Sequence, residues 1–113
     1  YHIPMIWYGG ALSLSDTSIS IISNQTDIAS TLLPQLGIDS RNFVFGKNIF
    51  AQQLSNKTLY MFNNGFGYLS DSLVFYYERD PNKYLVVKGK MDSTALRKSK
   101  AYLQMLYEDL LDR

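Results

Sequence analysis

The sequence predicts a small α/β fragment, in which a strand and a helix precede an antiparallel sheet and a closing helix. A continuous apolar run, HIPMIWY, fills residues 2–8 and is followed by paired glycines. Apolar side chains recur at helical spacing in residues 26–36 and 93–112. Between these two helices, short β-branched and aromatic runs alternate with the turn-forming stretches NNG and DPNK.

Residues 2–8 are expected to form a buried strand, because a continuous apolar run suits a strand that is covered on both faces. Pro4 cannot donate to a ladder, so we place it at the first residues of the strand or on a sheet edge. His2 is the single histidine, and beside a core strand we expect it to be a hydrogen-bonded structural residue rather than a metal ligand. Because Tyr1 opens directly into this run, we also expect the chain to be a piece of a longer protein.

A helix is predicted within the stretch SNQTDIASTLLPQLGI, residues 23–38. Residues 19–22 predict a short strand or an apolar lead into this helix. Ser23, Thr26 and Asp27 are candidate caps, because their oxygens can accept hydrogen bonds from the unpaired N–H groups of a first turn. A carboxylate at this end is also favoured by the helix dipole, so capping explains Asp27 without a catalytic role.

The predicted helix ends at a glycine. Gly37 fits the left-handed C′ position that follows many helices. Pro34 removes one backbone hydrogen bond inside the helix, so we expect either a kink or an irregular last turn. Residues 39–56 then predict a long connection, anchored by the apolar side chains of Phe43, Phe45, Ile49 and Phe50.

The next part of the chain predicts antiparallel strands. Asn64 followed by Gly65 is a strong hairpin signal. The sequence DPNK predicts a type I turn with Asp80 first and Pro81 second. The runs expected to be strands are residues 58–63, 66–70, 72–79 and 83–89.

A closing amphipathic helix is predicted over residues 93–112. Ser93 is a candidate N-cap, with Asp92 as its rival. Basic side chains near its start are expected to lie on a solvated face. The side chains expected to be buried are Leu96, Leu103, Leu106 and Leu110, widened by Tyr102, Tyr107 and Leu111.

Composition excludes several classes of function. The 113 residues are enough for one domain and carry a net charge of +1, which gives no electrostatic case for a nucleic-acid partner or an anionic membrane surface. There is no cysteine, which excludes disulfides and thiolate metal sites. No apolar run approaches the roughly 20 residues that span a bilayer.

No catalytic residue and no metal ligand is assigned from the residues themselves. The sequence has no glycine-rich phosphate loop, serine elbow or HExxH motif. Asn63 and Asn64 have two interpretations: their amides point into a polar pocket, or they simply make the turn. The chain has four early and central aspartates that do not form a metal-ligand spacing with His2, namely Asp16, Asp27, Asp39 and Asp71.

Five segments in order, HIPMIWYGGAL, ISNQTDIASTLLPQLGI, FVFGKNIF, FNNGFGYL and KSKAYLQMLYEDLL, resemble a known family. The chain resembles the C-terminal part of bacterial lipoteichoic-acid-synthase-like sulfatases and phosphoglycerol transferases, of the alkaline phosphatase superfamily. The resemblance covers nearly all of the chain. It implies that residues 1–50 form the edge of the α/β catalytic domain, and that residues 51–113 form a small C-terminal subdomain with an antiparallel sheet and a helix.

The resemblance also implies the chemistry of the parent enzyme. A threonine or serine nucleophile would attack a phosphate or sulfate ester, assisted by a divalent metal ion. Both the nucleophile and the metal ligands would lie upstream of residues 2–8, so this chain alone is expected to be inactive. Asn63 and Asn64 are predicted at the rim of the parent's pocket.

Partners and location follow from the same resemblance. The expected partner is the rest of the parent catalytic domain, with a second copy of the fragment as another. The parent would be anchored in the membrane by N-terminal helices, with this domain outside the cytoplasm in the cell envelope. The alternative of a different class is a stand-alone, non-catalytic interaction module that binds through its sheet and exposes no apolar strand.

Overall fold

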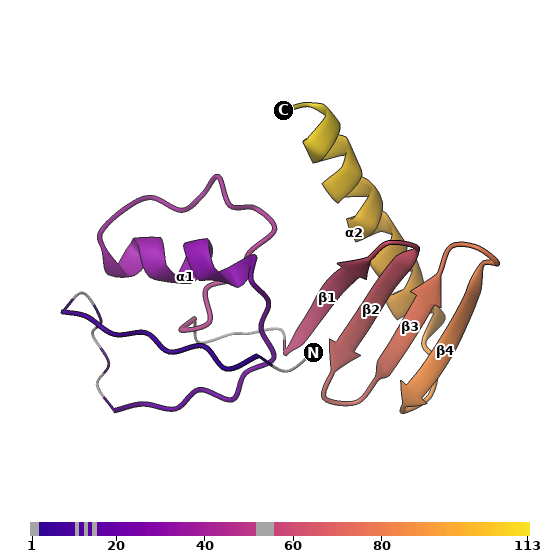
Figure 1. Cartoon of the computed structure of the whole chain (residues 1–113), viewed down its shortest axis with the longest axis horizontal. Coiled ribbons are helices and arrows are strands. Elements are labelled where there is room, and N and C mark those ends of the chain that lie inside the picture. The colour runs from indigo at the N-terminus through magenta and orange to yellow at the C-terminus, as the bar shows by residue number, and fades with distance from the viewer. Residues whose placement is uncertain (1–2, 11, 13, 15, 52–55) are drawn as a thin grey trace.

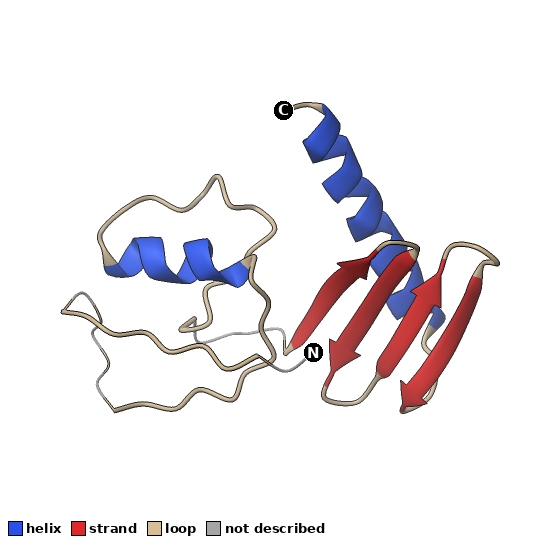
Figure 2. Ribbon diagram, in the orientation of Figure 1, coloured by secondary structure: helices blue, strands red, loops and turns tan. Residues whose placement is uncertain are grey.

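The computed structural model describes residues 3–10, 12, 14, 16–51 and 56–113. It shows a small α+β fold with two helices and a four-stranded antiparallel sheet, in the order β1-β2-β3-β4 (Figure 1). Figure 2 shows α2 running behind the sheet, while α1 and its connecting loops lie beside it. The elements are α1 (Asp27–Gln35), β1 (Lys57–Phe62), β2 (Gly65–Ser70), β3 (Val74–Glu78), β4 (Lys83–Lys88) and α2 (Ser93–Leu111).

The prediction of a first strand is wrong for the part of it that the structure describes. Residues 3–8 are irregular and pair with none of the four strands. Ile6 is 90% exposed, and Ile3 is 72% exposed. A strand needs a neighbouring chain to satisfy its N–H and C=O groups, and no described segment supplies one. Residues 19–22 are irregular as well, and His2 lies outside the described residues.

The predicted stop of α1 is confirmed. Gly37 has a φ of 70° and donates its N–H to the Pro34 carbonyl at 3.1 Å. The next N–H, of Ile38, reaches back to the Leu33 carbonyl at 2.9 Å. This pair of bonds is a Schellman motif, which satisfies carbonyls left over at a helix end. Pro34 lies inside the helix, and the Leu36 N–H that follows it is shared between two carbonyls, so the last turn is irregular as expected.

The first hairpin is confirmed, but its glycine acts differently from the expectation. Asn63 and Asn64 are the two loop residues between the paired Phe62 and Gly65. Neither asparagine has a positive φ, so the turn does not use their tolerance of that region. A Cβ on Gly65 would overlap the carbonyl of Tyr77 in the neighbouring strand. Gly65 is therefore required by the close approach of β2 to β3.

The turn between β3 and β4 begins one residue earlier than predicted. Its hydrogen bond runs from the Asn82 N–H to the Arg79 carbonyl at 2.8 Å. Pro81 therefore takes the third position and not the second, and the Asp80–Pro81 peptide bond is cis. The type I turn starting at Asp80 is wrong for this reason. Asn82 has a φ of 59°, a region that asparagine tolerates.

The core lies between α2 and one face of the sheet. Ser99 is buried where α2 meets the sheet, and it donates its hydroxyl proton to the Ala95 carbonyl at 2.8 Å. Lys100 lies over the ring of Tyr77 at 4.0 Å. The buried cluster is Phe66, Leu73, Phe75 and Tyr77, packed against Leu59, Tyr68, Val86, Met91, Ala95, Leu96 and Leu103.

The closing helix confirms part of its predicted face. Asp92 is the N-cap and accepts the Thr94 N–H at 2.8 Å, so the rival of Ser93 holds that position. Leu96, Leu103, Leu106 and Tyr102 are half-buried as expected, whereas Tyr107, Leu110 and Leu111 are exposed.

The length of α2 explains this correction. Its 19 residues extend about 28 Å, whereas strands of six residues extend about 20 Å. The last turn of α2 therefore lies beyond the sheet that it covers (Figure 1).

Replacing Gly65 with alanine should lower the free energy of unfolding by about 1–3 kcal/mol, because the new methyl group overlaps the β3 backbone. Urea unfolding followed by circular dichroism measures this change. The matched control is Gly10→Ala, since nothing lies within 4 Å of a Cβ there. Equal stability of the two variants would contradict the proposed role of Gly65.

Candidate functional site at the start of α1

The carboxylate of Asp27 connects the first turn of α1 to the chain on both sides. Asp27 is only 6% exposed. Its Oδ2 accepts the Asn24 N–H at 2.8 Å, and its Oδ1 accepts the Lys47 N–H at 2.9 Å. Thr26 occupies the N-cap position but makes no side-chain cap bond. Asp27 therefore closes the turn that enters the helix and also holds a loop that is 20 residues away in sequence.

Thr31 supplies a second connection between α1 and the same loop. Its side chain is fully buried. The hydroxyl lies 2.7 Å from the Asp27 carbonyl and 3.2 Å from the Lys47 carbonyl, and it accepts the Ile49 N–H at 3.1 Å. A buried backbone N–H without an acceptor is costly, so this hydroxyl determines where the loop lies.

Gly46 lets the loop pass close to the helix. A Cβ at this position would overlap both the Thr26 carbonyl and the Ser30 hydroxyl. The Ser30 hydroxyl in turn donates to the Phe43 carbonyl at 3.2 Å. The segments SNQTDIASTLLPQLGI and FVFGKNIF, which are separate in sequence, thus form one packed unit.

The side chain of Lys47 joins this unit to the sheet. Its ammonium donates to the Ile22 carbonyl at 2.6 Å and to the Lys57 carbonyl at 2.8 Å. It lies 4.0 Å from Asp27 Oδ2. Burial lowers the pKa of Lys47, while the negative charge of Asp27 acts in the opposite direction. Because its protons are directed to carbonyl oxygens, this lysine is suited to holding segments together rather than to attacking a substrate.

Two further contacts join the α1 unit to the other elements. The Tyr102 hydroxyl on α2 donates to the Phe45 carbonyl at 3.0 Å, and the two rings meet edge to face at 5.6 Å. Burial raises the pKa of Tyr102, and the negative charge of Asp27 adds to this rise. The Asn24 side-chain amide donates to the Leu59 carbonyl on β1.

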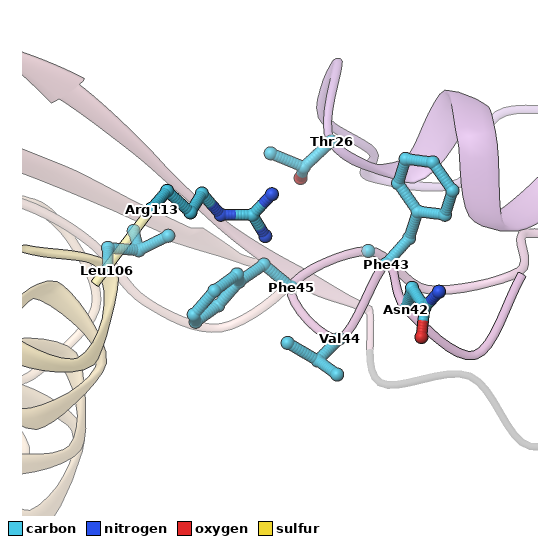
Figure 3. A pocket seen from close by; sticks show the side chains of 8 residues that line it. Thr26, Asn42, Phe43, Val44, Phe45, Leu106 and Arg113 are labelled. Carbon is cyan, nitrogen blue, oxygen red and sulfur yellow. The ribbon is translucent and has the colours of Figure 1, made fainter. Parts of the chain in front are cut away.

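A cavity of about 560 Å³ lies between the 42–46 loop and the end of α2. Figure 3 shows the Arg113 side chain extending into it across from Thr26 and Phe45. Its lining is mainly apolar and includes no carboxylate and no histidine among the described residues. Arg113 is already paired with Asp109 at 2.8 Å. The cavity can accept an apolar group, but it does not hold an acid–base pair or a nucleophile with its base.

The residues predicted at a pocket rim lie elsewhere. Asn63 and Asn64 are exposed at the β1–β2 turn, and neither lines this cavity or the smaller one of about 280 Å³ beside β1. The Asn64 amide donates to the Asp80 carbonyl at 2.8 Å, so it supports the neighbouring turn. Their position at the rim of a parent enzyme's pocket stays a prediction.

No group of three or more histidine, cysteine, aspartate or glutamate side chains is placed to hold a metal ion within the described part of the chain. The histidine, His2, is outside that part. The metal that the resemblance implies for the parent enzyme is expected upstream, so these residues do not test it.

Sequence patterns missed the two residues that carry most of this site. Thr31 was not singled out, although a polar residue on the apolar side of a predicted helix is a signal for a buried hydrogen bond. Lys47 lay in a segment noted only for its resemblance. Its role depends on carbonyls at residues 22 and 57, which no local pattern connects.

No family model matches the chain, and no curated protein and no solved structure matches it. Among the helices that the structure describes, none combines the length and apolar character needed to cross a membrane.

Replacing Asp27 with alanine should lower the free energy of unfolding by about 1–3 kcal/mol, because the N–H groups of Asn24 and Lys47 lose their acceptor. Chemical denaturation measures the loss. Asp39→Ala is the matched control, since Asp39 is an exposed aspartate bound to exposed Arg41, and it should change stability little. If both variants lost the same amount, the connecting role of Asp27 would be wrong.

Alkaline pH should weaken the fold through Tyr102. The pKa of Tyr102 is raised above its ordinary value of 10.0, so the unfolded chain ionises first. Its stabilisation is complete below the unfolded pKa and is lost as the pH rises through the folded pKa. The free energy of unfolding of Tyr102→Phe should therefore fall less between neutral pH and a pH above 10.0 than that of the wild type.

The control for this pH experiment is Tyr107→Phe, which removes an exposed tyrosine from the same helix. It should keep the wild-type pH dependence. Identical pH profiles for Tyr102→Phe and the wild type would show that the buried hydroxyl does not carry the effect.

Proposed function

We propose that this chain is the C-terminal part of a metal-dependent enzyme of the alkaline phosphatase superfamily that acts on phosphate or sulfate esters. It would belong to a sulfatase or phosphoglycerol transferase that resembles lipoteichoic acid synthase. The catalytic nucleophile and the metal ligands would come from the preceding part of the parent. This chain would complete the catalytic domain and support its fold without taking part in the chemistry.

The observation that carries the proposal is the contact between two segments on which the resemblance rests. SNQTDIASTLLPQLGI supplies the Asp27 carboxylate and the Thr31 hydroxyl, and FVFGKNIF supplies the N–H groups of Lys47 and Ile49 that these oxygens accept. The residue types within the two motifs thus have a physical reason to occur together. Their shared purpose in this chain is structural, which agrees with a part of the enzyme that lies outside the catalytic centre.

The exposed apolar segment at residues 3–8 gives further support. Ile3, Met5, Ile6 and Tyr8 are all exposed. A segment of this composition is stable when another strand pairs with it and covers it. The neighbouring sheet of a parent catalytic domain would supply both, so the segment fits a surface that is buried in the larger protein.

In the parent, a divalent metal ion would activate the nucleophile and stabilise negative charge on the ester oxygens. No described side-chain group of this chain fits such an ion, so none is assigned to it. The residues of this chain would contribute position: Asp27, Thr31 and Lys47 hold the α1 unit, and Tyr102 fixes α2 against it. The parent would be membrane-anchored, with this part in the cell envelope.

A stand-alone interaction module is the competing function. That hypothesis expects a chain without an exposed apolar strand-forming segment. The exposure of Ile3 and Ile6 argues against it. The four-stranded sheet by itself is compatible with either function.

The test compares the purified 113-residue chain with the protein encoded by the whole reading frame. Each is assayed with Mg²⁺ or Mn²⁺ against p-nitrophenyl phosphate, p-nitrophenyl sulfate and phosphatidylglycerol. The chain alone should release no product, whereas the whole protein should cleave at least one ester class. In the whole protein, Asp27→Ala should reduce the amount of folded enzyme, and Asp39→Ala should not.

Ester cleavage by the isolated chain would overturn this proposal. So would a reading frame without an upstream nucleophile motif and an Asp-His metal pair, or a whole protein that cleaves none of the three esters.

A further inference from the structure

The two edges of the sheet differ in what lies beside them. β1 is one edge, and its outer side is occupied by the chain itself. The Asn24 amide donates to the Leu59 carbonyl, and the Lys47 ammonium donates to the Lys57 carbonyl. β4 is the other edge, and no described segment lies along its outer side (Figure 1). An open edge presents unpaired N–H and C=O groups to any strand of matching length.

The open edge is also apolar. Tyr84, Leu85 and Val87 are all more than half exposed. Lysines at positions 83 and 88 bound this apolar centre at its two ends. Exposed edges of this composition are rare without a partner, because they favour pairing with another chain.

One row of side chains on the sheet face opposite α2 leads directly to this edge. Tyr60, Gly67, Tyr76 and Leu85 are successive cross-strand partners on β1, β2, β3 and β4. The rings of Tyr60 and Tyr76 meet at 6.2 Å above Gly67, where a Cβ would overlap the Tyr60 ring. The row ends at Leu85, which is 65% exposed.

We propose that β4 pairs antiparallel with β4 of a second copy of this chain, with Leu85 on the two-fold axis. The two four-stranded sheets then form one continuous sheet, with both α2 helices on the same side. The apolar row from Tyr60 to Leu85 continues into the same row of the second copy. This surface is distinct from residues 3–8, so it does not depend on the function proposed above.

The register follows from side-chain direction and charge. Directly opposed residues must point to the same face, so the regular part of β4, residues 83–86, pairs with positions of matching orientation. Centring on Leu85 places Tyr84 opposite Val86 of the second copy. It also places Lys83 opposite Val87, so the ammonium groups of Lys83 and Lys88 do not face each other. A shift of one residue would oppose these lysines and turn the apolar row to the wrong face.

Single cysteines test the register without background, because the chain has no cysteine. Two residues on a two-fold axis of an antiparallel pair have Cα atoms about 4.5–5.5 Å apart, within reach of a disulfide. Mild oxidation of Leu85→Cys should therefore give a disulfide-linked dimer on non-reducing gels. Val87→Cys is the matched control, with 59% exposure against 65%, but its two copies would lie about 13 Å apart.

Analytical ultracentrifugation of the whole chain tests the dimer itself. The wild type should sediment as a concentration-dependent dimer. Leu85→Lys should raise the dimer dissociation constant at least about tenfold, because it brings two like charges together on the axis. Ile6→Lys is the control, since it adds the same charge to the other exposed apolar segment and should leave the constant unchanged.

Circular dichroism must show that both variants are folded. A wild type that is monomeric at every soluble concentration overturns the proposal. So does dimerisation that Ile6→Lys abolishes and Leu85→Lys does not, or equal crosslinking of Leu85→Cys and Val87→Cys.

Discussion

The Asp27 carboxylate is the constraint on which the arrangement of the α1 unit depends. It is almost completely buried, so its oxygens must be satisfied within the protein. They accept backbone N–H groups from Asn24 and Lys47, one before the helix and one after the long connection. Once Lys47 is fixed in this way, its ammonium reaches the start of β1. A single buried charge thereby connects the helix, the loop and the sheet edge.

The sheet combines this fixed edge with a second, open one. α2 buries Phe66 and Phe75 on one face, while the opposite face carries aromatic rings over glycines. Tyr60 covers Gly67 across the strand pair, so one ring takes the space that a side chain on β2 would otherwise fill. The result is a thin two-layer structure whose free surfaces differ: β1 is closed by polar groups, and β4 is open and apolar.

Local sequence signals predicted the elements well, and long-range contacts account for what they missed. The left-handed Gly37 and the Asp92 cap depend on neighbours within one turn, so composition and spacing suffice to find them. The buried strand at residues 3–8 depends on a partner that no described segment supplies. The site at Asp27 was interpreted as helix capping. Its main partner, the Lys47 N–H, lies 20 residues away and is invisible to a local pattern.

The overhang of α2 has a consequence for how the protein opens. Segments with few buried apolar contacts unfold locally at a lower free energy than the core. Leu110 and Leu111 make little contact with the sheet, whereas Ser99 lies at the centre of the interface. The helix is therefore not one cooperative unit. Its final turns can unwind and reform while the first half stays protected, and Tyr102, through its bond to Phe45, marks the boundary between the two behaviours.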